Sequence, residues 1–591
     1  MTDDESVVDV EKPGTDSARS DDDASASSSH PSPTRLGADS LAKDWRSRSD
    51  PDAIAGDVPS FDLDLELAQH PSAADLQRIE TRISIKSRVS RAVSVLGHGR
   101  SLRASLSRKE KRERIAFAPI PTTDLAAGVV GWDGQEDPAM PLNFANSKKW
   151  LIVGLVSAIT FVTPFASSIL APGIGAVDRE FNNTNDIIGT MTVSIYLLGY
   201  VIGPLFLAPL SEIYGRRVVL SAANAFFCVW QIGCALAPSI EILIVFRFFS
   251  GIGGAGCLTL GAGVIADVFR TDERGFAMGI YTLGPLLGPT LGPLIGGFVS
   301  QSIGWRWDFW IVFIVGTVIV LMTEIFIVET NPHVLMARKV KRLQKELGRP
   351  ELRSCYVTDA TPKSHTAILI NGLVRPTKML FLSPLVFSLS LYMAFTYGGL
   401  YLLFTTIPVV FQETYHWDIG LTGLVYICLG LGNLAGWAVI TAFSDKSVVR
   451  QTKANGGIFE PEMRLPMSIG FSFCLPITFF WYGWTTHFHT HWIWPVLGLF
   501  PFSFAIIGLY LPIITYLVDC YPVYAASAVA ANTVLRSLVG MLLPLAGPIM
   551  YKNLGLGWGN SVLGFICVAM IPVPMLIHRY GRRLRMKGIQ L

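Results

Sequence analysis

Long apolar runs alternate with short polar or basic segments over most of the chain. From residue 150 onward the apolar residues gather into about twelve runs of roughly 20 residues each. A helix of about that length is needed to cross the hydrocarbon core of a bilayer. The pattern therefore predicts an all-α membrane protein with about twelve transmembrane helices.

The same pattern divides the chain into five parts. Residues 1–136 are expected to form a disordered cytoplasmic tail, because their Ser-, Asp-, Ala- and Pro-rich composition buries too little apolar surface to offset the entropy of ordering. Residues 137–330 and 379–578 each hold half of the predicted spans, and residues 331–378 form a cytoplasmic linker between them. Residues 579–591 form a basic cytoplasmic C-terminal tail.

The distribution of charge supports this topology. Basic residues are concentrated in the loops that lie inside when both termini are cytoplasmic, as the positive-inside rule requires. The first part of the linker, residues 332–347, is expected to form an amphipathic helix on the inner membrane surface. The first outer loop carries Asn182-Asn183-Thr184, which makes Asn182 a predicted glycosylation site.

Composition argues against several classes of protein. Only 16% of the residues are charged, against about 25% in soluble domains, so a soluble multidomain protein is not expected. Most of the eight cysteines lie inside apolar runs, where they act as small hydrophobes. Nucleic acid is not an expected partner, because the basic segments are tethered to a membrane domain.

Enzymatic and metal chemistry are not expected either. The sequence contains no G-x-x-x-x-G-K loop, and no run pairs His, Asp or Ser at catalytic spacing, so neither catalysis nor direct use of ATP is expected. The alternating His487, His489 and His491 have no carboxylate or Cys beside them. We therefore expect no metal and no cofactor.

A basic hairpin follows the second predicted span, where residues 208–220 read APLSEIYGRRVVL. Gly215 permits a tight turn, Arg216 and Arg217 hold the loop on the cytoplasmic side, and Glu212 is expected to pair with an arginine or cap the next helix. The segment resembles the loop 2–3 motif of the major facilitator superfamily, G-x-L-a-D-r-x-G-r-k-x-x-l, with Glu212 in place of the Asp. Residues 444–466 occupy the corresponding place in the second half but have lost the pattern.

A single arginine lies in the fourth apolar run, LIVFRFFSGIGGAG. Arg247 costs several kcal/mol there unless it is paired, faces water or snorkels to the outer surface. With Gly251 and Gly253 it resembles the fourth-helix motif R-x-x-x-G-x-g, whose Arg is implicated in proton coupling in this superfamily. Asp267 begins the next cytoplasmic loop and is the expected partner of Arg216 in a gate on the inner side.

Residues 279–297 read GIYTLGPLLGPTLGPLIGG, too rich in Gly and Pro for an ordinary helix. Glycines four apart line one face and let another helix approach to backbone contact; neighbours must re-satisfy the carbonyls that the prolines free. The spacing resembles the fifth-helix motif of exporters, G-x-x-x-G-P-x-x-G-G, although a plain close-packing seam is the alternative. The residues concerned are Gly284, Pro285, Gly288, Pro289, Gly292 and Pro293, followed by Gly296 and Gly297.

Taken together, residues 137–585 resemble the fungal twelve-helix drug:proton antiporters of this superfamily. The resemblance implies two six-helix bundles around a central cavity, alternating access and proton-driven export. It also implies a monomer in the plasma membrane, or alternatively the vacuolar membrane, that acts on a small molecule and protons. Three rivals remain: a polyamine carrier, a facilitative uptake carrier, which residues 279–297 disfavour, and a non-transporting membrane sensor.

The residue that carries the proton stays open, because the first span contains no acidic residue. We expect coupling through Arg247, Glu324 or Asp519. Arg536 lies deep in the eleventh span, so it must face the bundle interior or a cavity.

Aromatic residues of the seventh span form a predicted wall for a large amphipathic substrate, with core packing or lipid contact as the alternative. They are Tyr392, Phe395, Tyr397 and Tyr401. Few carboxylates and two arginines in the spans favour a neutral or anionic amphiphile, such as a drug, a fungicide or a secreted secondary metabolite like a glycolipid.

Overall fold

The computed structural model describes residues 120–270, 273–357 and 365–586. Most of the predicted disordered tail, residues 1–119, and the end of the basic C-terminal tail lie outside the described residues. All other predicted segments can be compared with the structure.

The N-terminal half contains six membrane-spanning segments. They are α3 (Asn146–Ser168) with η4 (Ala171–Gly173) and α4 (Ile174–Glu180); α5 (Asp186–Ser194) with α6 (Tyr196–Tyr214); α7 (Arg216–Ala235); α8 (Ile240–Val268); α9 (Arg274–Ser302); and α10 (Arg306–Phe326).

The linker and the C-terminal half follow the same plan. The linker holds α11 (Pro332–Leu347), β2 (Arg353–Ser354) and α12 (His365–Leu382). The spans are α13 (Pro384–Tyr415); α14 (Ile419–Ala454); η5 (Pro461–Arg464) with α15 (Leu465–Ser472) and α16 (Cys474–His487); α17 (Ile493–Gly498) with α18 (Phe500–Cys520); and, after η6 (Pro522–Tyr524), α19 (Ala525–Met570) with α20 (Pro572–Met586).

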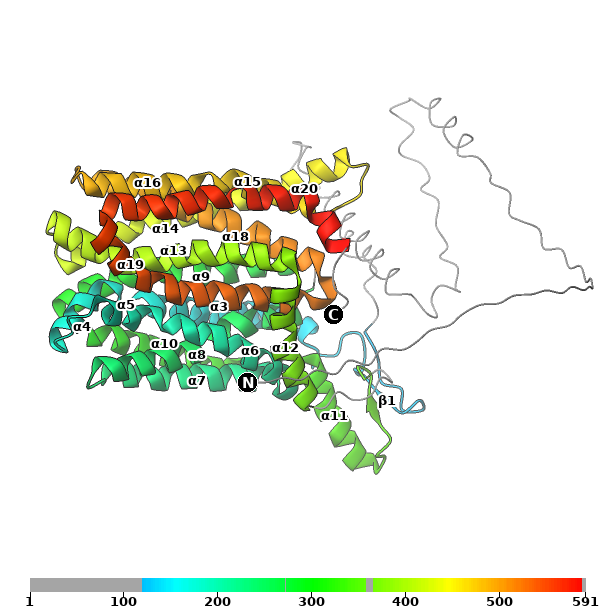
Figure 1. Cartoon of the computed structure of the whole chain (residues 1–591). Coiled ribbons are helices and arrows are strands. Elements are labelled where there is room, and N and C mark those ends of the chain that lie inside the picture. The colour runs from blue at the N-terminus through cyan, green and yellow to red at the C-terminus, as the bar shows by residue number, and fades with distance from the viewer. Residues whose placement is uncertain (1–119, 271–272, 358–364, 587–591) are drawn as a thin grey trace, which may run out of the picture. The chain divides into compact units, whose positions relative to one another are not determined.

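The last of these segments crosses the membrane twice. Eleven helices of the described chain are long and apolar enough to span a bilayer, and the eleventh, Ala525–Arg585, has 61 residues. A straight helix of that length would measure about 90 Å, roughly three times the hydrocarbon thickness. Gly555 interrupts it with φ 71° and ψ 172°, and the chain reverses direction within α19 (Figure 1). The fold therefore has the twelve predicted crossings.

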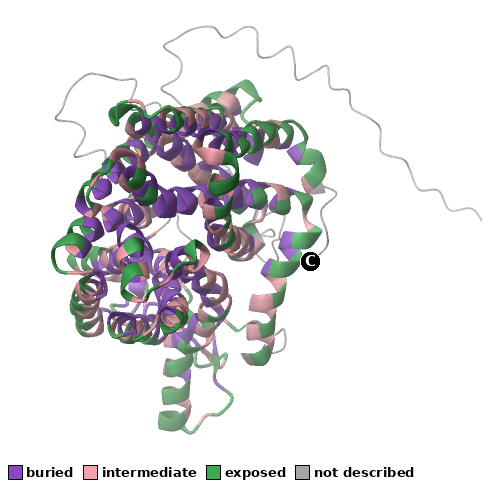
Figure 2. Ribbon diagram, turned by 60° about the vertical axis from the view of Figure 1, so that its left-hand side comes forward, coloured by how far each residue is buried: buried purple, intermediate pink, exposed green. Residues whose placement is uncertain are grey.

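Burial follows the pattern expected for helices in lipid. Buried positions face the interior of the helix bundles, and exposed positions lie on the outward faces (Figure 2). Many of the exposed residues are large and apolar, for example Val229, Ile325 and Phe565. A soluble protein rarely leaves so much apolar surface in contiguous patches, whereas lipid tails accept it.

The glycine stripe of α9, formed by Gly284, Gly288, Gly292 and Gly296, packs against α3. A Cβ on Gly288 would lie 2.7 Å from the Phe161 carbonyl oxygen, and one on Gly296 would lie 2.0 Å from the Ile169 carbonyl oxygen. Ser168 Oγ of α3 donates to the Pro289 carbonyl oxygen at 2.9 Å, the acceptor that Pro293 leaves free four residues later. Both the predicted backbone approach and the predicted rescue of a freed carbonyl are present.

The helices of the two halves meet closely at the outer end. The Gly420 amide of α14 donates to Gln301 Oε1 of α9 at 2.7 Å, and a Cβ on Gly423 would lie 2.9 Å from the Pro293 carbonyl oxygen. Near the inner end of α9, a Cβ on Gly275 or Gly279 would meet nothing within 4 Å. These contacts between α9 and α14 lie toward the C-terminal end of α9.

A small unit outside the membrane-spanning helices joins the segment before α3 to the linker. β1 (Val129–Val130) pairs in parallel with β2, and Trp132 Nε1 donates to the Tyr356 hydroxyl at 2.9 Å. Burial raises the pKa of the Tyr356 phenol, so this group remains neutral near pH 7. The apolar residues of the unit pack into a cluster of their own: Val130, Trp132, Met140, Met336, Val340 and Leu352.

In this unit the structure differs from two predictions made from the sequence. Residues 120–136 were grouped with the disordered tail, but Val129, Val130 and Trp132 supply enough local apolar surface to order the segment. The helix predicted at 332–347 is present as α11. Its apolar residues pack into the cluster with Trp132, so this face of α11 covers protein rather than lipid.

Candidate functional site

Arg247 of α8 is completely buried, so it does not snorkel. Its Nη1 donates to the Ala166 carbonyl oxygen at 2.7 Å, its Nη2 to that of Ser167 at 2.8 Å, and its Nε to that of Thr192 at 2.9 Å. Its guanidinium also lies 4.9 Å from the centroid of the Tyr196 ring. The charge is thus compensated by carbonyl oxygens and an aromatic face.

These carbonyls are available because helices end there. Ala166 and Ser167 belong to the last turn of α3, and Thr192 belongs to the last turn of α5. The last four carbonyl groups of a helix have no partner within it, and they carry the negative end of the helix dipole. Arg247 therefore fastens two helix C-termini together, a role that no local sequence pattern reveals.

Tyrosines extend this site across the boundary between the halves. The Ser167 and Tyr401 hydroxyls are 2.7 Å apart and hydrogen-bonded, which joins α3 to α13. The Tyr397 and Tyr401 rings lie 5.1 Å apart, and the Tyr196 and Tyr200 rings of α6 lie 5.2 Å apart. The phenols thus line the interface at the depth of Arg247.

Arg536 of α19 lies at the other end of these tyrosines. Its guanidinium is 4.5 Å from the Tyr397 ring centroid and 5.0 Å from that of Tyr510. Within the described part of the chain, Arg536 Nε, both amide atoms of Asn532 and Ser537 Oγ are buried without a hydrogen-bond partner. Asn532 and Arg536 are four residues apart and therefore share a helix face, so this side of α19 presents unsatisfied donors and acceptors.

The predicted aromatic wall is split by the structure. Tyr397 and Tyr401 belong to the interface just described. Tyr392 is completely buried, and the groups that face it are Ser472 of α15 and Cys567 of α19. Phe395 is also buried. Spacing along α13 could not separate these roles, because nearly every position of this span is covered by protein.

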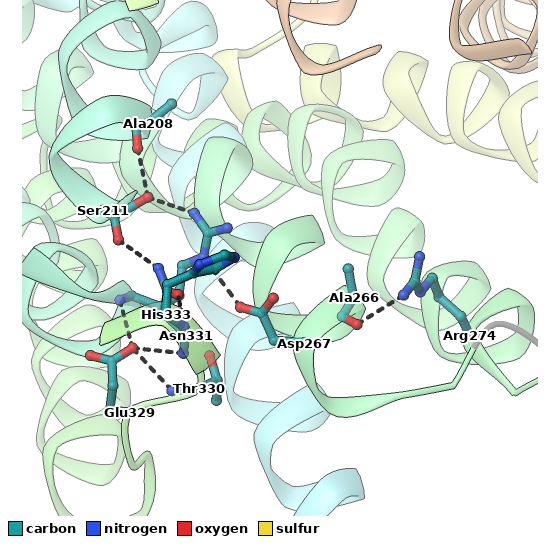
Figure 3. Close-up of polar contacts among 10 residues, drawn as sticks. Ala208, Ser211, Ala266, Asp267, Arg274, Glu329, Thr330, Asn331 and His333 are labelled. Atoms are coloured by element: carbon teal, nitrogen blue, oxygen red, sulfur yellow. Dashed lines mark hydrogen bonds and ion pairs between the residues drawn. The ribbon is translucent and has the colours of Figure 1, made fainter. Parts of the chain in front are cut away.

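The loop 2–3 segment forms a compact polar cluster at the inner end (Figure 3). Arg216 Nε is 3.3 Å from Asp267 Oδ2, and Arg216 Nη1 donates to Ser211 Oγ at 2.6 Å. The expected pairing between Arg216 and Asp267 is therefore present. It joins the start of α7 to the end of α8.

Glu329, which the sequence did not single out, caps the start of α7. Its Oε1 accepts the backbone amides of Arg216 at 2.8 Å, Thr330 at 3.0 Å and Asn331 at 2.9 Å. The expected candidate for this role, Glu212, is exposed. Glu212 lies in the last turn of α6 and is exposed there, whereas the chain after α10 brings Glu329 to the start of α7.

We expect Glu329→Ala to lower the free energy of unfolding by about 1–2 kcal/mol, because three buried amides lose their acceptor. Glu212→Ala is the matched control from the same cluster and should change stability by less than about 0.5 kcal/mol. Thermal unfolding of the two variants in detergent measures both values. Equal melting temperatures would show that Glu329 does not act as the cap.

Glu324 lies away from the interface between the halves. Its Oε2 is 3.6 Å from Arg217 Nη2, and both side chains are about 40% exposed (41% and 42%). Arg217 Nη2 also donates to the Glu324 carbonyl oxygen at 2.9 Å. The pair lines a surface cavity of 380 Å³ together with Arg338, so Glu324 is a half-exposed helix-end residue in this conformation.

The second half repeats the inner ion pair without the sequence motif. Arg464 of η5 is nearly buried, and its Nε is 2.9 Å from Asp519 Oδ2 at the end of α18. Arg464 stands at the start of the ninth span, as Arg216 stands at the start of the third. The ion pair is therefore retained although residues 444–466 do not resemble the loop 2–3 motif.

Asn182 is exposed in the outer loop between α4 and α5. Its φ of 53° places it in the left-handed region, which Asn tolerates in turns. The position is accessible to modification, and glycosylation there stays a prediction.

Comparison with known proteins agrees with this architecture. The family model described as Major Facilitator Superfamily matches residues 156–544. The chain is 50% identical to the MFS transporter cpaT of Aspergillus oryzae over 78% of this chain and 92% of that protein. It is 44% identical to the efflux pump radE of Floropilus chiversii over 77% of this chain and 85% of that protein.

Solved structures show the same fold at low identity. The partially occluded inward-open xylose transporter XylE from E. coli superposes with a TM-score of 0.55 at 17% identity, over 76% of this chain and 100% of that one. A family model that covers most of the membrane region, close fungal relatives and twelve crossings in two halves lead to one conclusion. The chain belongs to the major facilitator superfamily and is a multi-pass membrane transporter.

Proposed function

We propose that this protein exports amphipathic small molecules by proton antiport with alternating access. The observation that carries the proposal is the cluster at the interface between the halves, where Arg247 and Arg536 flank Tyr196, Tyr397 and Tyr401. A substrate held there touches both halves, so its binding can bias their relative orientation. The fungal relatives named as transporters, one of them as an efflux pump, support this direction.

The chemistry of the cluster favours a neutral or anionic substrate. Phenol and guanidinium groups donate hydrogen bonds to carbonyl, phenolate or carboxylate oxygens, and aromatic faces accept apolar rings. The unsatisfied face of α19, with Asn532 and Arg536, offers further contacts for an oxygen-rich group. A polyamine would place several positive charges beside two arginines, so the polyamine alternative is disfavoured.

The distribution of contacts supports alternating access. The outer ends are joined through Ser167 and Tyr401 and through Gln301 and Gly420. At the inner end, the pairs Arg216–Asp267 and Arg464–Asp519 hold helices within each half. We propose that these inner pairs act as gate elements, that the protein works as a monomer in the plasma membrane, and that the vacuolar membrane is the alternative site.

The test begins with the substrate. Metabolites of cells and medium are compared with and without the gene, and a compound lost from the medium is then loaded into vesicles that contain the purified protein. Arg536→Ala should lower its export at least tenfold, whereas the exposed control Lys552→Ala should leave the rate unchanged. Equal rates for Arg536→Ala and wild type would refute the assigned site, and flux of spermidine alone would favour the polyamine carrier.

A further inference from the structure

A second buried charge site lies at the outer end of the N-terminal half. Asp308, in the first turn of α10, has no solvent exposure. Its Oδ2 accepts a hydrogen bond from Ser300 Oγ of α9 at 2.7 Å. In the described part of the chain its Oδ1 is buried and has no hydrogen-bond partner. One oxygen of the carboxyl group is therefore unsatisfied in this conformation.

The charged and titratable groups near Asp308 do not neutralise it by direct contact. Arg247 of α8 is within electrostatic reach, but its Nε, Nη1 and Nη2 each donate to a backbone carbonyl. On the same helix Arg306 pairs with Glu180 of α4, and α7 contributes the buried thiol of Cys234, which faces Arg247. α9 offers the Ser300 hydroxyl.

An ionised carboxylate in such surroundings is costly. A buried charge without a paired cation destabilises a protein by several kcal/mol, and uptake of a proton removes that cost. Water is kept out by Trp305, which is 3% exposed and whose Nε1 donates to Glu180 Oε2 at 2.7 Å. The closed outer end therefore favours the neutral acid at Asp308.

We propose that Asp308 is a proton-binding site that controls closure of the outer end of the transporter. When the outer end is open, one proton passes from the outer aqueous phase to Asp308 Oδ1, and the charge of the side chain changes from negative to neutral. The neutral side chain then permits the outer end to close. Opening of that end re-exposes the carboxyl group to water, where it ionises.

Arg247 connects this proton to the interface between the halves. Its guanidinium lies 5.6 Å from the ring centroid of Phe309, the residue after Asp308, and it holds the Ser167 carbonyl oxygen. The Ser167 hydroxyl in turn bonds Tyr401 of the other half. A negative Asp308 attracts Arg247 and competes with its carbonyl partners, whereas a neutral Asp308 leaves the bridge between Ser167 and Tyr401 intact.

The first experiment needs no substrate. Infrared difference spectra of the full-length protein in lipid nanodiscs are recorded between pH 5 and pH 9. We expect a protonated carboxyl C=O band that disappears in Asp308→Asn, moves in frequency in Asp308→Glu and persists in the exposed control Asp186→Asn. A wild-type spectrum that Asp308→Asn leaves unchanged would overturn the proposal.

The second experiment reads the outer end directly. Hydrogen–deuterium exchange of Ala171–Gly173 and of residues 418–423 is compared between wild type and Asp308→Asn at pH 9, the most basic point of the infrared series. Asp308→Asn imitates the neutral acid, so these segments should exchange at least threefold more slowly than in wild type. Equal exchange would contradict the link between the proton and closure.

The outcomes separate this inference from the proposed function. If Asp308 titrates but a pH gradient drives no export, antiport fails and the protonation site stands. If a pH gradient drives export equally in wild type and Asp308→Asn, antiport stands and Asp308 does not control the outer end.

Discussion

Replacing Arg247 by alanine is expected to abolish export and to lower the free energy of unfolding by about 3–5 kcal/mol. The substitution leaves the carbonyl oxygens of Ala166, Ser167 and Thr192 buried without their donor, and each buried unsatisfied group costs about 1–3 kcal/mol. The three carbonyl contacts show that the residue also holds the helices together.

Arg247→Lys separates the two effects. Lysine keeps the charge but cannot reach three carbonyls with the planar fork of arginine, so we expect partial recovery of thermal stability and a loss of export of at least tenfold. Melting temperature and pH-gradient-driven flux in vesicles measure the two effects. Wild-type flux in either variant would show that Arg247 takes no part in transport.

Gly296→Ala is expected to lower the free energy of unfolding by about 2–3 kcal/mol and to slow export. Its Cβ would lie 2.0 Å from the Ile169 carbonyl oxygen, a backbone atom that cannot turn aside, so α9 and α3 must move apart. Overpacking of this kind typically costs about 1–3 kcal/mol. Thermal unfolding and flux of the same preparation measure the change.

Gly279→Ala on the same helix is the matched control. A Cβ there meets nothing within 4 Å, and alanine favours helix over glycine by about 1 kcal/mol, so stability should be unchanged or slightly higher. The same melting temperature for the two variants would mean that the seam between α9 and α3 does not depend on its bare glycine face.

Features that depend on the spacing of residues close together in the sequence could be predicted. The spans follow from hydropathy and length, and the glycine stripe of α9 follows from its four-residue period, including the close approach that Gly288 and Gly296 make to α3. The pairing of Arg216 with Asp267 also followed, because the positive-inside rule places both residues at the same membrane surface.

Features that depend on distant segments could not be predicted. Glu329 caps a helix that begins 113 residues earlier, and Asp308 looks like an ordinary interfacial residue beside Trp305 and Arg306 until its burial is known. The split of the α13 aromatics between the interface and the C-terminal half has the same cause, since a helix covered on all sides gives no periodic signal. The ion pair between Arg464 and Asp519 could not be predicted, because the second half keeps this pairing although residues 444–466 no longer resemble the motif.

The most direct test of the account is flux in vesicles that contain the purified full-length protein and the compound identified by metabolite comparison. An imposed pH gradient should drive the compound across the membrane and move protons the opposite way, and both movements should vanish in Arg247→Lys. Movement of the compound down its own gradient at the same rate with and without a pH difference would contradict antiport.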